Sequence, residues 1–266
     1  MNRRSFLIGA GGLLAAPAFA LNEAAKPAAG LALGAAINKA GRQRMLSQRM
    51  AKAYAMQSAG VLPERAGQLL DSSRRLFEAQ LAELKTLAPS EAIQGALATL
   101  DTAWRLYREV LARSPSPDNA RQVLAESENT LRAAHALTLL YEKQAAGSAG
   151  HLVNIAGRQR MLSQRMAKCF LFEQSGIDSA GLRSERDTAR REFVAALAEL
   201  NAAPENNPAI RTELELANTQ WLFFEQALNG RETVREIAAR NVATTSERIL
   251  EVMDSLTGRY EGLVRG

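Results

Sequence analysis

Two identical stretches of thirteen residues carry the side chains best suited to binding a ligand in this sequence. Residues 40–52 and residues 156–168 both read AGRQRMLSQRMAK. On a helix that turns by about 100° per residue, Arg44 lies at the centre of a face of small and polar residues, and Arg160 holds the same place in the second copy. Small neighbours let another backbone approach this face closely. Each guanidinium there needs a partner, because an unpaired buried charge costs several kcal/mol.

Two kinds of partner fit an arginine on such a face. The ordinary one is an acidic side chain on a neighbouring helix, or solvent reached by snorkelling. The other is a bound anion, which is favoured because the motif contains no Asp or Glu and is repeated unchanged while the surrounding sequence has diverged. If the copies pack motif to motif, Arg44 and Arg160 repel each other by about 3 kcal/mol at ~5 Å and an effective dielectric of about 20. An anion between them would replace this repulsion with two charge-assisted contacts. If the copies lie apart, two separate sites would each be completed by a second chain.

The remaining composition argues against an enzyme. Of the 266 residues, 47% are hydrophobic and 23% charged, as in ordinary globular proteins, and only 5% are aromatic, which favours packed helices. The single Cys169 excludes an internal disulfide. We expect it to be a buried free thiol, and we expect His135 and His151 to be structural or solvent-facing. There is no P-loop, GxSxG or HExxH motif. We therefore predict no catalytic residue, no metal and no cofactor, and the net charge of +5 does not indicate a nucleic-acid partner.

Residues 1–20 have the organisation of an export signal. Arg3 and Arg4 precede an apolar run, and the sequence Ala-Phe-Ala at 18–20 is typical of a cleavage site. The order Arg-Arg-Ser-Phe-Leu favours a twin-arginine signal, which exports folded bacterial proteins, over a general secretory signal. No later apolar run is long enough to cross a membrane, so we expect the mature chain to be soluble in the periplasm.

Beyond this signal, the chain consists of one unit repeated in tandem. Weaker matches follow the motif in the same order in both copies; Trp104, for example, corresponds to Trp221. Clusters of Pro, Gly, Ser and Asn divide each copy into four segments with apolar residues at three- and four-residue spacing. These features predict an all-α chain of two tandem up-down four-helix bundles. The expected boundaries are a linker at 21–33, the first bundle at 34–146 and the second bundle at 147–266.

The motif, together with the asparagine two residues before each copy (Asn38 and Asn154), resembles a known sensor signature. It is similar to the N-terminal sensor domain shared by PilJ-type pilus chemoreceptors and nitrate/nitrite sensor kinases of the NarX/NarQ type. The resemblance implies periplasmic four-helix bundles that form homodimers, with nitrate bound by one arginine from each subunit. The matching Gly-x-x-Arg-Met steps imply that Arg44 and Arg160 bind the ligand. Gly41 and Gly157 would then allow close backbone approach.

The motif departs from that of the nitrate kinases at the Arg-Gln pairs 42–43 and 158–159. These pairs are more typical of the PilJ type. The membrane helices, HAMP segment and output domains of these families are missing from the sequence, which implies a membrane-bound receptor, kinase or transporter component as partner.

Two functions follow from these observations. The first is a periplasmic sensor or binding protein for a small oxyanion, nitrate or nitrite above all. The second is a protein-interaction module whose motif surface docks a helix or a receptor ectodomain and takes no small ligand. The tandem pair is expected to act as an intramolecular pseudo-dimer or to form a homodimer.

Overall fold

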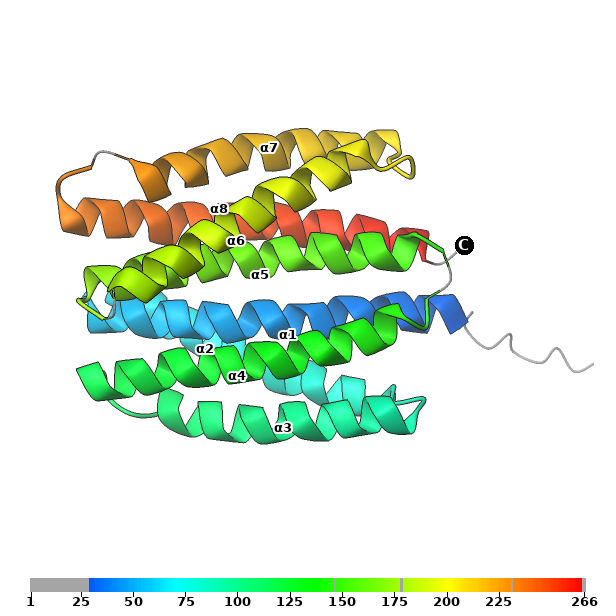
Figure 1. Cartoon of the computed structure of the whole chain (residues 1–266), viewed down its shortest axis with the longest axis horizontal. Helices are drawn as coiled ribbons and strands as arrows, with labels where there is room; N and C mark the ends of the chain where they lie inside the picture. The colour runs from blue at the N-terminus through cyan, green and yellow to red at the C-terminus, as the bar shows by residue number, and fades with distance from the viewer. Residues whose placement is uncertain (1–28, 146, 178, 231, 265–266) are drawn as a thin grey trace, which may run out of the picture.

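The computed structural model describes residues 29–145, 147–177, 179–230 and 232–264 (Figure 1). In these ranges the chain forms eight helices and no strand, which confirms the predicted all-α fold of two tandem bundles. The expected export signal and residues 21–28 of the expected linker lie outside the described residues. The helices are α1 (Ala29–Ser58), α2 (Pro63–Thr86), α3 (Glu91–Leu111), α4 (Pro117–Glu142), α5 (Ala149–Gln174), α6 (Ser179–Ala202), α7 (Pro208–Asn229) and α8 (Arg235–Leu263).

The helices begin and end at residues whose chemistry favours these boundaries. Pro63 and Pro117 are the first residues of their helices, where a missing N–H costs little. Ser90 and Asn207 cap α3 and α7 by accepting a hydrogen bond from a backbone N–H three residues later. Within the part of the expected linker that is described, Ala29 already begins α1, because the segment 29–37 is rich in alanine and leucine.

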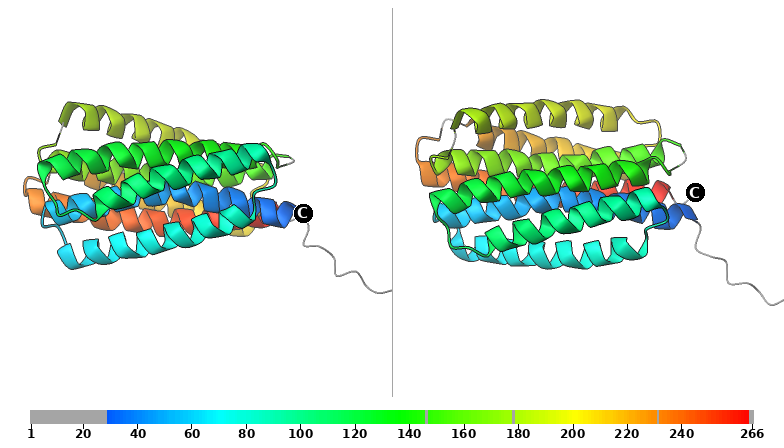
Figure 2. Two further views of the ribbon diagram at one scale, coloured as in Figure 1. Left: turned by 90° about the horizontal axis from the view of Figure 1, so that it is seen from below. Right: turned by 60° about the horizontal axis from the view of Figure 1, so that its bottom comes forward.

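The two motif helices occupy the middle of the molecule. Within the first repeat α1 packs against α2 and α4, and within the second repeat α5 packs against α6 and α8. The two repeats meet mainly where α1 and α5 lie side by side, as Figures 1 and 2 show from three directions. The motif therefore lies at the interface between the repeats.

The aromatic residues of both repeats pack in the same way. Trp104 stacks on Phe77 with ring centroids 4.3 Å apart, and Trp221 stacks on Phe193 at 4.4 Å. Each of these four side chains is buried. The matched tryptophans are thus core residues that occupy equivalent places in the two repeats.

Two further observations concern residues outside the motif face. Cys169 is buried and free, and burial raises the pKa of its thiol to about 12, so that the reactive thiolate is disfavoured. Among the helices described, none is both long and apolar enough to span a bilayer.

Candidate functional site

The structure brings Arg44 of α1 and Arg160 of α5 together in the interface between the repeats. Both side chains are fully buried. A Cβ atom at Gly41 would lie 3.1 Å from Arg44 Nη2 and 3.7 Å from Arg160 Nη2. A Cβ atom at Gly157 would lie 3.1 Å from Arg160 Nη2 and 3.6 Å from Arg44 Nη2. Both guanidinium tips therefore rest against both glycines, at the place where the two helix backbones approach each other.

The hydrogen bonds of Arg160 include a carboxylate. Its Nη1 donates to Asp254 Oδ1 on α8, and its Nη2 donates to Asn38 Oδ1 at 2.8 Å and to the Asn38 carbonyl oxygen at 3.2 Å. An acidic side chain on a neighbouring helix, the ordinary expectation for a helix arginine, is thus present for Arg160.

Arg44 has no such carboxylate among the residues that the structure describes. Its Nη2 donates to the Asn154 carbonyl oxygen at 3.2 Å, and its Nη1 lies 3.3 Å from His135 Nδ1 on α4. Because an arginine only donates, this histidine nitrogen must be the acceptor. The Nε atoms of Arg44 and Arg160 are buried and have no partner within the described ranges.

The electrostatics of the pair follow from these contacts. Burial, together with the positive charges of Arg160 and Arg158, lowers the pKa of Arg44 to about 9. Burial also lowers the pKa of Arg160, to about 10, against the opposite effect of Asp254. Both guanidinium groups remain charged at neutral pH, whereas burial and Arg44 lower the pKa of His135 and keep its ring neutral.

His135 and Asp254 are the site residues that sequence reasoning did not find. A signal for them exists, because the repeat correspondence that pairs Ser127 with Ser246 also pairs His135 with Asp254. The sequence predicts a structural or solvent-facing role for His135, yet its ring contacts the central Arg44. His151, by contrast, forms hydrogen bonds with Glu142 and Glu199 on the surface.

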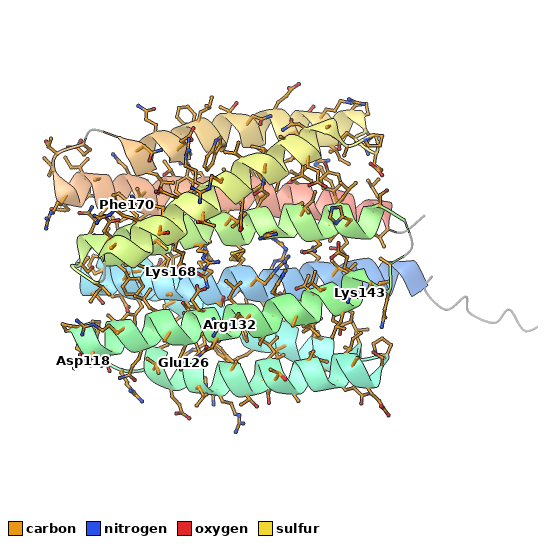
Figure 3. All side chains as sticks on the ribbon, in the orientation of Figure 1. Asp118, Glu126, Arg132, Lys143, Lys168 and Phe170 are labelled. Atoms are coloured by element: carbon orange, nitrogen blue, oxygen red, sulfur yellow. The ribbon has the colours of Figure 1, made fainter. Side chains whose placement is uncertain are left out.

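At one end of the interface, basic residues in the last part of each motif form ion pairs with a glutamate of the other repeat. We call these the exchanged ion pairs. Lys52 and Arg49 of the first repeat both contact Glu247 of the second repeat, and Lys52 Nζ lies 2.5 Å from its carboxylate. Conversely, Lys168 and Arg165 of the second repeat contact Glu128 of the first repeat at 2.7 and 2.8 Å. Lys168 lies where α5 runs beside α1 in Figure 3. Packing thus accounts for part of the sequence identity between the two motifs.

The same packing bears on the expectation that the motif surface docks a helix or a receptor ectodomain. Most of the motif residues on α1 and α5 are buried. The motif surface is therefore occupied by the other repeat and is not free to dock a receptor ectodomain. Among the described residues no group of three or more His, Cys, Asp or Glu side chains is placed to hold a metal ion.

Comparison with known proteins places these features in a family. The family model described as the type IV pili methyl-accepting chemotaxis transducer N-terminal domain, PilJ, matches residues 30–137 and again residues 143–250. The chain belongs to the PilJ family. Its two PilJ domains correspond to the two helical repeats, and the membership supports a role as a sensory module. No curated protein and no solved structure matches the chain significantly.

Proposed function

We propose that this PilJ-family chain is a periplasmic sensory module that acts through contact with a membrane-anchored signalling protein. The tandem PilJ match is the observation that carries this proposal, since the family is named for the N-terminal part of a chemotaxis transducer. The motif faces of the two repeats already cover each other, so the partner has to bind an outer surface.

The second repeat offers such a surface where α7 and α8 meet. A groove of about 690 Å³ between them is lined in part by Phe223, Ala227 and Arg248. The lining residue Phe223 is 54% exposed, and its chain neighbour Leu222 is 64% exposed. At the position of Leu222 the first repeat has the charged Arg105, so this surface is more apolar in the second repeat than in the first.

Site-specific photo-cross-linking in the cell tests this proposal. A photoreactive amino acid at position 223 is compared with the same amino acid at position 106, where Leu106 is the exposed equivalent in the first repeat. We expect position 223 alone to cross-link to a membrane-anchored protein with a periplasmic domain, and we expect Leu222→Arg to abolish the product. Equal cross-linking from both positions, or none from position 223, would contradict the proposal.

A second candidate function concerns what the module senses. Arg44 is a fully buried cation that forms no ion pair with a carboxylate in the described part of the chain, and it lies next to a second buried arginine. Such a pair is stabilised by an anion small enough to lie between the two helices, and the planar oxygens of nitrate or nitrite suit the guanidinium fork. This observation supports a small oxyanion as the ligand.

Thermal unfolding with a panel of anions tests this second candidate. At constant ionic strength, nitrate or nitrite is expected to raise the Tm more than chloride does. Arg44→Gln is expected to remove the difference. A Tm that responds to all salts equally, in the wild type and the variant alike, would leave the arginine pair as a structural feature.

A further inference from the structure

We infer that Asp254 is the residue that sets the charge of the anion at the arginine pair, so that the site takes a singly charged anion and discriminates against a doubly charged one. This inference rests on the oxyanion-binding function proposed above. It comes from a difference between two repeats that otherwise build the site from the same residues.

The two repeats have different residues at one corresponding position next to the pair. His135 and Asp254 occupy corresponding positions on α4 and α8, between the matched pairs Ser127/Ser246 and Tyr141/Tyr260. Each contacts the arginine of its own repeat: His135 lies against Arg44 Nη1, and Asp254 accepts from Arg160 Nη1. Two otherwise equivalent positions thus hold a neutral ring on one side and a carboxylate on the other.

The neighbouring arginines follow the same asymmetry. Arg42 Nη2 donates to Asp254 Oδ1 at 2.6 Å, which ties α1 of the first repeat to α8 of the second. Its counterpart Arg158 instead donates to Glu192 at 2.8 Å. The position of Glu192 is occupied by Leu76 in the first repeat.

The other acidic groups near the pair are engaged with asparagines. Glu142 accepts from Asn154 Nδ2 at 2.6 Å, and Glu261 accepts from Asn38 Nδ2 at 2.5 Å. Neither carboxylate forms a hydrogen bond with Arg44 or Arg160 in the described residues. Asp254 is therefore the carboxylate in direct contact with the arginine pair.

Asp254 acts on the pair through its negative charge. Two fully buried guanidinium groups meet at the interface, and the Asp254 carboxylate is shared by Arg160 and by the partly exposed Arg42. The second negative charge of a doubly charged anion at the pair would be repelled by this carboxylate. Asp254 therefore lowers the affinity for a doubly charged anion more than that for a singly charged one, by about tenfold or more.

Two substitutions in the full chain test this inference, one that removes a carboxylate next to the arginine pair and one that adds a carboxylate. Nitrate and sulfate are the probes, at fixed ionic strength. Asp254→Asn removes the internal carboxylate at nearly constant shape and is expected to shift the affinity ratio towards sulfate by at least about tenfold. His135→Asp gives Arg44 the partner that Arg160 already has and is expected to weaken nitrate binding by at least about tenfold. Asp118→Asn is the control, because Asp118 is exposed on α4 and, within the ranges that the structure describes, pairs with Arg121 in the next turn alone.

The outcomes separate this inference from the function on which it rests. If the wild type binds nitrate but Asp254→Asn keeps the wild-type ratio of nitrate to sulfate affinity, Asp254 does not select the charge and the inference is wrong. If neither anion binds the wild type or either variant, the oxyanion function itself fails. Retained nitrate affinity in a folded His135→Asp variant also overturns the inference, even if Asp254→Asn does not fold.

Discussion

At the residue scale, the two central arginines are chemically identical but differently paired, and the difference predicts their effects on stability. Arg160→Gln removes the partner of a carboxylate and of Asn38, and is expected to destabilise the anion-free protein by about 2 kcal/mol more than Arg44→Gln. In Arg160→Gln, Asp254 still has Arg42 as a partner. The loss of unfolding free energy is therefore smaller than for a buried carboxylate left without any partner. Urea unfolding of both variants in an anion-poor buffer measures the difference, and equal losses would contradict this assignment of partners.

The residues of the arginine pair could be predicted from the sequence, whereas their contacts could not. Arg44 and Arg160 stand out because an unchanged motif places them on one helix face of small residues. His135 and Asp254 lie 91 and 94 residues further along the chain and carry no local motif. Their role depends on how α4 and α8 are rotated about their axes, which is decided by packing of the whole bundle.

At the element scale, the close approach of α1 and α5 depends on the two motif glycines. Gly157→Ala would place a Cβ atom 3.1 Å from Arg160 Nη2 and force a fully buried guanidinium to move. Gly95→Ala in α3 would meet no atom within 4 Å, and is expected to stabilise the protein by about 0.5–1 kcal/mol through helix propensity. In the same denaturation assay we expect Gly157→Ala to show little of this stabilisation. Equal stabilisation by both substitutions would show that the interface between α1 and α5 has space for a methyl group at position 157.

The exchanged ion pairs between the elements predict a loss of stability in acid. Burial raises the pKa of Glu247, but Lys52 and Arg49 outweigh this effect and hold it at about 2, below the ordinary value of 4.5. The ionised carboxylate therefore stabilises the fold fully above about pH 4.5, and this contribution, about 3 kcal/mol, is lost as the pH falls towards 2. Glu247→Gln should flatten the dependence of the unfolding free energy on pH between 5 and 2.

The control for this pH dependence is Glu236→Gln on the same helix. Glu236 is exposed, and its one ion pair among the described residues is with Arg240 one turn away, so its removal should leave the acid dependence unchanged. An identical pH profile for the wild type and Glu247→Gln would show that the inter-repeat pairs are not the source of acid sensitivity.

At the scale of the whole molecule, the two repeats behave as a dimer that has been joined into one chain. Residues 21–146 alone would expose the motif face of α1, and Lys52 and Arg49 of one copy would find Glu128 of another. We therefore expect the isolated first repeat to form a homodimer, which sedimentation velocity would detect. A folded first repeat that stays monomeric at high concentration would contradict the pseudo-dimer description.

The architecture of the whole molecule was predictable for a physical reason. Proline at Pro63 and Pro117 and the capping residues punctuate the sequence locally, so the helices could be placed before the fold was known. Local sequence does not decide which helix faces form the interface between the two bundles, because several helices have a small-residue or polar face that could serve. The ion pairs of Glu247 and Glu128, which lie far from the motif in sequence, favour the arrangement that is observed.

We propose that the duplication builds one anion site per chain, shared by Arg44 and Arg160, and the selection of anion charge by Asp254 rests on this site. Isothermal titration of the full chain with nitrate, against chloride at the same ionic strength, tests it most directly. The account predicts saturable binding of one nitrate per chain, lost in Arg44→Gln and in Arg160→Gln alike. Two nitrates per chain, one of them retained in each single variant, or no saturable binding at all, would contradict it.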